Sequence, residues 1–151
     1  MKLEDEIKQK SFANPYLRMV VNVMFTGNWL QKALSCQLKQ YGVSLQQHNV
    51  LMILRGQYPN PATLGLIQER MLDRESNATR LVDKLLEKDL VTRCQCAGNR
   101  RKVDILITEK GLDLLKQTDG IMSDLEEKYR HITPSEATLV GELMDKIRDC
   151  R

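Results

Sequence analysis

The spacing of apolar residues along the chain predicts a mainly helical protein. Apolar positions recur every three or four residues, which is the period of an α-helix with one buried face. The first such stretch runs from Pro15 to Gly42, and its stripe includes Leu17, Val20 and Met24. The same period continues through five later segments: residues 45–57, 62–72, 76–89, 109–132 and a last one that opens at residues 133–136.

Residues that start or stop helices mark most of these boundaries. Gly42 is placed to end the first helix, because glycine tolerates the left-handed conformation that follows many helices. Ser44, with Gln47 three residues later, predicts a capping box. Thr108 is expected to cap the helix after it. Thr-Pro-Ser-Glu at 133–136 combines a capping box with proline at the first helical position.

One region alternates with a period of two instead. Val103, Ile105 and Ile107 are apolar every second residue, so we expect strands at residues 90–97 and 101–107 around a Gly-Asn turn. The two short helices before this hairpin are joined by a short connection, as in a helix-turn-helix. The predicted fold is therefore mainly α, a winged helix-turn-helix with a two-stranded wing and flanking helices.

The flanking helices carry apolar stripes that a small central lobe would leave exposed. We therefore expect a symmetric homodimer that buries them. This interpretation divides one compact domain into three regions. Residues 1–43 and 109–151 would supply the dimerisation helices, and residues 44–108 would form the winged helix-turn-helix lobe.

Positive charge is concentrated in one stretch. The formal net charge is +3, but residues 74–102 hold eight Lys and Arg against four Asp and Glu. The rest of the chain has fifteen basic residues against sixteen acidic ones, so the basic excess lies beside the predicted hairpin. A local excess of this kind favours a polyanion partner.

Two groups of side chains in this stretch are suited to DNA. The helix that begins near Ser76 starts with Asn, Thr and Arg, whose side chains pair with base edges or phosphates in a major groove. The hairpin tip carries cations that fit a narrow minor groove. The alternatives are ordinary capping residues and a charged turn that protects a sheet edge. The candidate DNA-binding residues are Arg74, Ser76, Asn77, Thr79, Arg80, Lys84, Asn99, Arg100, Arg101 and Lys102.

Taken together, "SNATRLVDKLLEKDLVTR" and "GNRRKVDILITEKG" resemble the signature of the MarR family of transcriptional regulators. The resemblance covers essentially the whole chain. It implies a homodimer that binds a pseudo-palindromic operator, with half-sites about one helical turn apart. It also implies a repressor that releases DNA when a small, often aromatic or phenolic, ligand binds. Phe25, Trp29 and His48 are the candidate lining residues of that pocket.

The chain departs from the family pattern at two positions. Asp89 replaces a glycine at the end of the recognition helix, where aspartate tolerates the left-handed conformation better than most residues. Asn99 replaces the aspartate that in the family helps to hold the wing arginine, here Arg101. The loss of that charge leaves Arg101 less tightly positioned.

Other functions find little support in the sequence. Cys94-x-Cys96 lacks the second ligand pair and the spacing of a zinc site, so we expect neither a metal nor a cofactor. No nucleophile, phosphate loop or paired-carboxylate motif suggests an enzyme. The charged N-terminus is not a signal peptide, which indicates a cytoplasmic protein. Two alternatives stay open: a redox-sensing regulator switched through Cys94 and Cys96, and a winged-helix protein-interaction module without DNA binding.

Overall fold

The computed structural model describes residues 1–96 and 99–149, and for residues 95, 96 and 99–103 it describes the backbone alone. The chain divides into two compact units, Met1–Leu115 and Lys116–Arg151. Each unit is described by itself below.

The first unit begins with a short helix that is tied to a long one. Helix α1 (Leu3–Glu6) precedes α2 (Pro15–Leu38), which the side chain of Asn14 caps. Arg18 of α2 donates from Nε to the Glu4 carboxylate at 2.6 Å. This hydrogen bond and the positive charge of Arg18 hold the pKa of Glu4 below its usual value. A 3-10 turn, η1 (Lys39–Tyr41), follows α2 and ends at Gly42.

Three helices build the central lobe as predicted. They are α3 (Leu45–Arg55), α4 (Leu64–Arg70) and α5 (Ala78–Leu86). The predicted capping box of α3 is confirmed, with Ser44 and Gln47 bonding each other's backbone. Leu51 of α3 is fully buried, whereas Ile53 is only half-buried. The central core is Val50, Leu51, Leu54, Ile67, Val82, Leu85 and Ile105.

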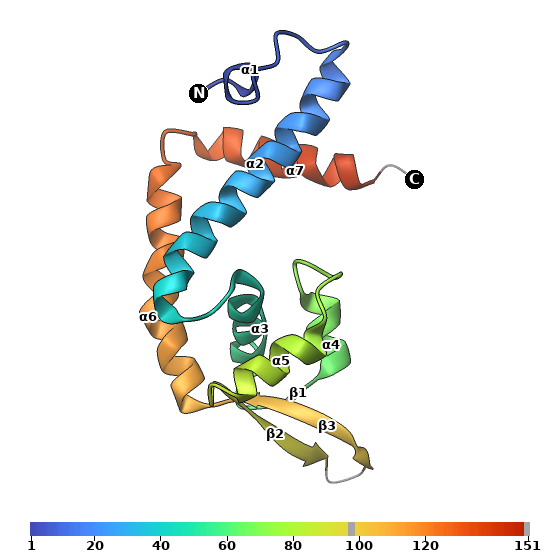
Figure 1. Cartoon of the computed structure of the whole chain (residues 1–151), viewed down its shortest axis with the longest axis vertical. Helices are drawn as coiled ribbons and strands as arrows, with labels where there is room; N and C mark the ends of the chain where they lie inside the picture. The colour runs from blue at the N-terminus through green and yellow to red at the C-terminus, as the bar shows by residue number, and fades with distance from the viewer. Residues whose placement is uncertain (97–98, 150–151) are drawn as a thin grey trace. The chain divides into compact units, whose positions relative to one another are not determined.

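A small antiparallel sheet completes the lobe (Figure 1). The hairpin is formed by β2 (Val91–Cys96) and β3 (Asn99–Ile107), and its turn at residues 97–98 lies outside the described residues. A short strand that the sequence did not reveal, β1 (Ala62–Thr63), pairs with the other side of β3, giving the order β1-β3-β2. Ala62 lies opposite Ile105, so this strand adds a buried alanine to the core.

Helix α6 (Glu109–Lys128) follows β3 and runs from the first unit into the second. Its start is hydrogen-bonded to the residues that follow α5. Asp89 has φ +58°, which confirms that it takes the left-handed conformation expected of a glycine there. Thr108 donates its backbone N–H to the carbonyl of Leu90 at 3.1 Å and its hydroxyl to that of Asp89 at 2.7 Å. The Thr108 hydroxyl also accepts from Gly111 N, as its predicted capping role requires.

In the second unit, α6 is followed by α7 (Pro134–Arg148). The predicted capping box is present, since Thr133 and Glu136 bond each other's backbone. The Thr133 hydroxyl and backbone N–H hydrogen-bond the Glu136 carboxylate and lower its pKa. Leu139, Val140 and Leu143 of α7 remain exposed, each by 45% or more.

Within the described ranges, each helix falls short of the length or the apolar character that crossing a bilayer demands.

We expect Gly111→Ala to lower the free energy of unfolding by about 2 kcal/mol, because an added methyl group overpacks this site. A Cβ at Gly111 would lie 2.3 Å from the Leu90 carbonyl oxygen. Gly120 of the same helix has open space around its Cβ position, so Gly120→Ala is the matched control and should raise stability by about 0.5–1 kcal/mol. Urea titration of both variants measures the difference. Equal responses would show that α6 does not press against the start of β2.

Candidate nucleic-acid interface

The start of α5 is held by a set of local hydrogen bonds. Asn77 is the N-cap, and its side-chain oxygen accepts from Arg80 N at 3.0 Å. The Ser76 hydroxyl donates to the Asp73 carboxylate at 2.6 Å. The side chain of Gln68, on α4, donates to the Ser76 carbonyl at 3.0 Å and accepts from Ala78 N at 3.2 Å. Asn77 therefore has the capping role that was the alternative considered for it from sequence, whereas the Ser76 hydroxyl bonds within the connection before α5.

The outward face of α5 presents cations. Arg74, just before the helix, is exposed, as are Thr79, Arg80 and Lys84, whereas Ala78, Val82 and Leu85 face the core. Arg74, Arg80 and Lys84 form no ion pair with another residue of the described part of the chain. Their charges are therefore available to an external anion.

A shallow groove runs along this face. Its volume is about 370 Å³, and it connects α5 with the start of α3. Its lining is Ser44, Gln46, Ser76, Asn77, Arg80, Leu81 and Lys84. Sequence reasoning missed Ser44 and Gln46 as members of this surface. Ser44 carried only a capping signal, and the packing of α3 against α5 that brings both residues here has no local signature.

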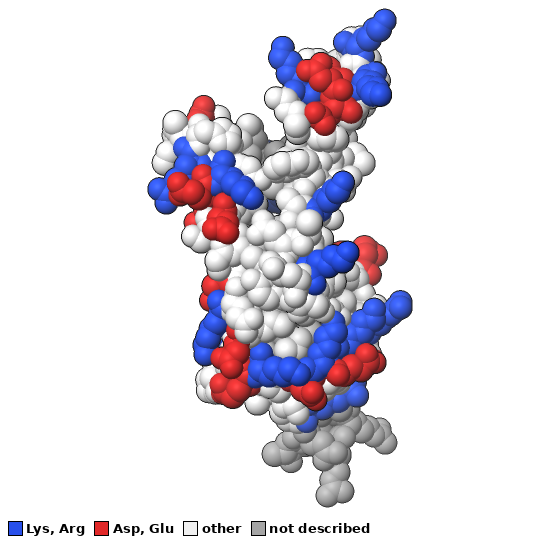
Figure 2. All heavy atoms as spheres, turned by 60° about the vertical axis from the view of Figure 1, so that its left-hand side comes forward, with Lys and Arg blue, Asp and Glu red and all other residues white. Residues whose placement is uncertain are grey.

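Other cations in the basic stretch have structural partners. Arg93 of β2 forms an ion pair with Asp83 of α5. Lys88 donates to the Gly42 carbonyl at 2.6 Å. On the face drawn in Figure 2, blue and red side chains mix just above the grey atoms. Part of the basic excess counted along the sequence is therefore engaged within the lobe.

The predicted wing residues Asn99, Arg100, Arg101 and Lys102 lie on the backbone of β3. Their side chains fall outside the described residues, so their predicted role keeps the support of the sequence alone. The β2–β3 hairpin extends away from α3, α4 and α5 in Figure 1. A pairing irregularity between Gln95 and Cys96 shifts the register just before the turn.

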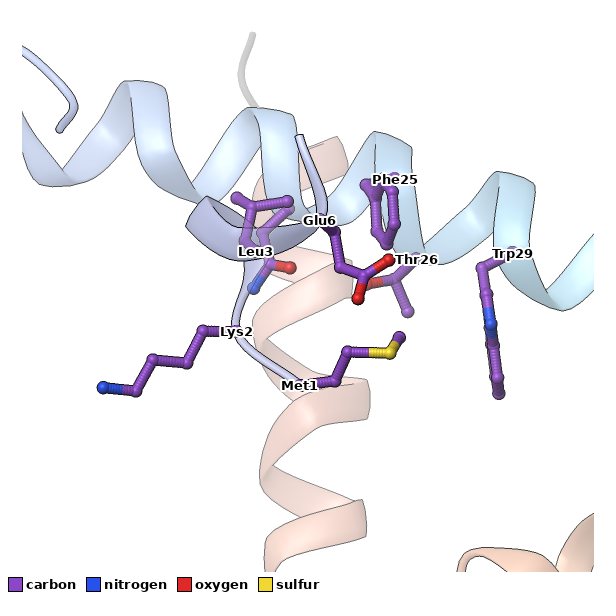
Figure 3. A pocket seen from close by; sticks show the side chains of 8 residues that line it. Met1, Lys2, Leu3, Glu6, Phe25, Thr26 and Trp29 are labelled. Atoms are coloured by element: carbon purple, nitrogen blue, oxygen red, sulfur yellow. The ribbon is translucent and has the colours of Figure 1, made fainter. Parts of the chain in front are cut away.

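A separate cavity of about 190 Å³ lies between the N-terminal segment and α2 (Figure 3). Two of the three predicted pocket residues, Phe25 and Trp29, line it, whereas His48 does not. Figure 3 shows the Glu6 carboxylate and the Met1 side chain on the side of Phe25 and Trp29, with Lys2 directed away. The structure thus brings the two aromatic residues to one hollow surface.

The described cysteines and possible metal ligands show no assembled site. Cys36 is an exposed free thiol and Cys94 a half-buried one, and the side chain of Cys96 lies outside the described residues. Among the residues that the structure describes, no three His, Cys, Asp or Glu side chains cluster as a metal site would require.

The sequence of the winged helix-turn-helix described above matches that of a known family. Residues 43–103 match the model of the MarR family. The central lobe of the chain is therefore of the MarR-family type. MarR-family proteins are DNA-binding, winged-helix transcriptional regulators and not enzymes.

Several solved structures share the fold along most of the chain. A MarR transcription factor from Planctomyces limnophilus is 26% identical, covers 89% of this chain and 98% of its own, and has a TM-score of 0.67. MepR of S. aureus, in a MepR–DNA complex, is 18% identical over 93% of this chain and 100% of its own, with a TM-score of 0.79. BpsR of Bordetella bronchiseptica is 19% identical over 82% and 98%, with a TM-score of 0.64.

We expect Asn77→Ala to lower the free energy of unfolding by about 1 kcal/mol, because α5 loses its N-cap. Asn77→Ser keeps a capping oxygen and should restore most of the loss. Thr79→Ala is the matched control on the exposed face and should change stability by less than about 0.5 kcal/mol. Thermal unfolding separates the three. An Asn77→Ala protein as stable as the wild type would mean that the cap contributes nothing to the free energy of unfolding.

Proposed function

We propose that a homodimer of this chain binds a pseudo-palindromic DNA operator, with α5 in a major groove and the wing in the adjacent minor groove. The observation that carries the proposal is the exposed face of α5, where Arg74, Arg80 and Lys84 have no acidic partner among the described residues. The fold similarity to MepR, which was solved in a DNA complex, supports the DNA binding itself. Acting on DNA, the protein would work in the cytoplasm.

The groove between α5 and α3 extends the proposed contact. Gln46 and Ser44 lie beside Arg80 and Lys84, so α3 would approach the phosphate backbone while α5 reads base edges. Among the α5 residues, Arg80 is best suited to reading a base, because its side chain is exposed while Asn77 caps the helix. Thr79, Lys84 and Arg74 would supply further base or phosphate contacts, and Asn99, Arg100, Arg101 and Lys102 those of the wing.

The proposed dimer rests on exposed apolar surface. On α2, Tyr16 is 77% exposed and Met24 64% exposed. On α7, Leu139 and Val140 are about half exposed. Isolated apolar residues on a surface are common, but contiguous helical stripes mark an interface. Residues 1–43 and 109–151 would form this interface, and residues 44–108 would form the DNA-binding lobe.

We also propose that a small aromatic effector weakens DNA binding, so that the protein acts as a ligand-responsive repressor. Phe25 and Trp29 at the cavity beside α2 support an aromatic ligand, because aromatic rings stack on one another. DNA binding by BpsR, which has the same fold, is regulated by 6-hydroxynicotinic acid. An effector that seats against α2 would act on the helix that leads to the central lobe through η1 and Gly42.

Two substitutions separate the base-reading contact from the wing contact. Arg80→Ala should lower affinity for a duplex selected from a random library by about 1–3 kcal/mol and affect mixed-sequence DNA little. Arg101→Ala should weaken binding to both duplexes and reduce the slope of log affinity against log salt by about one. Fluorescence anisotropy at several salt concentrations measures both effects.

Lys10→Ala is the control for this comparison, since it removes one exposed cation far along the chain from α5 and the wing. It should leave both affinity and slope unchanged. A wild-type protein that binds no duplex, or whose affinity is insensitive to salt, would refute DNA binding. Equal losses on selected and mixed DNA for Arg80→Ala would reassign Arg80 to a phosphate contact.

Leu143→Asp should shift the protein from dimer to monomer, because it places a charge within the proposed apolar interface. Thr138→Asp adds the same charge at an exposed polar position of α7 and is the matched control. Sedimentation at micromolar concentration gives the mass, and the wild-type monomer is 17.4 kDa. A wild type that sediments as a monomer would contradict the dimer.

A further inference from the structure

A lysine at the end of α5 binds oxygen atoms from two other segments. Lys88 Nζ donates to the Gly42 carbonyl oxygen at 2.6 Å and to the Gln47 side-chain oxygen at 3.2 Å. An ammonium group has three donors, and two of them are engaged here. The same Gln47 oxygen accepts from Ser44 N at 3.0 Å, and Gln47 is only 4% exposed. Lys88 therefore contacts a polar group that the fold already holds in place.

The two acceptors identify the segments that Lys88 connects. Gly42 follows the turn that ends α2, and its φ of +70° directs the chain away from that helix. Gln47 belongs to the capping box that starts α3. Carbonyls near a helix C-terminus carry partial negative charge, which favours a lysine there. One side chain thus joins the end of α2, the start of α3 and the end of α5.

The residues after Lys88 are fixed on another side. The Asp89 carbonyl accepts from the Thr108 hydroxyl at 2.7 Å, and the Leu90 carbonyl accepts from Thr108 N at 3.1 Å. These bonds tie the end of α5 to the start of α6. The end of α5 therefore lies between two anchors, one that leads to α2 and one that leads to α6.

We propose that Lys88 is a positioning residue that transmits movement of the α2 terminus to the recognition helix, and that it does not contact DNA. This inference rests on the proposed DNA binding by α5. Displacement of the Gly42 carbonyl would pull on the ammonium group and rotate or shift α5, whose exposed residues lie less than three turns away. Lys84, one turn earlier on α5, is exposed and has no acidic partner among the described residues, so it is the cation available to phosphate.

Substitution of the two lysines tests this assignment, because each change removes one positive charge from the same region. Lys88→Met should lower affinity for the selected duplex on the order of tenfold, as typical coupling between sites does, and leave the salt slope unchanged. Lys84→Met should reduce the salt slope by about one. Lys88→Arg keeps the charge and the donors and should retain most of the affinity, which also covers the case in which Lys88→Met folds poorly.

Several results would overturn the proposal. One is a salt slope that falls by about one for Lys88→Met, because it would make Lys88 a phosphate contact. Unchanged affinity in Lys88→Met would show that the bond positions nothing. Hydrogen exchange gives a readout that needs no DNA: amides at residues 42–47 and 85–90 should exchange faster in Lys88→Met but not in Lys84→Met. If no duplex binds the wild type, the proposed function fails, and unchanged exchange would separately refute the connection.

Discussion

The close contact between the start of β2 and the start of α6 constrains much of this structure. The Leu90 carbonyl accepts from Thr108 N, and the first turn of α6 lies so near that residue 111 has no room for a Cβ. To bring Leu90 there, the chain must reverse direction directly after α5, which it does through the positive φ of Asp89. Because Leu90 directly precedes β2 and Thr108 directly precedes α6, the wing and the following helix both begin at this contact.

Local signals predicted the helices well because capping is decided within a few residues. Ser44, Thr108 and Thr133 all cap the helices expected of them, and Asp89 takes the conformation inferred from a departure at a family glycine. Strand β1 escaped prediction because two residues have no period, and its pairing with β3 depends on a distant segment.

The candidate site was predictable only in part. The cations of α5 could be found from charge and from the helical period, but sequence could not separate Arg80 and Lys84, which are exposed and lack described acidic partners, from Arg93, which pairs with Asp83. Nor could it place Gln46 beside α5 or exclude His48 from the cavity that Phe25 and Trp29 line. These facts depend on how helices pack, and packing is a property of the assembled lobe.

Gln68 has a consequence for how this protein tolerates changes in length. Its side chain hydrogen-bonds the backbone at Arg74, Ser76 and Ala78, so it holds the connection between α4 and α5 at three points. One inserted or deleted residue between positions 74 and 78 would change the spacing of these backbone groups, so that Gln68 could no longer bond all three. Variation in this connection is therefore restricted to exchange of side chains.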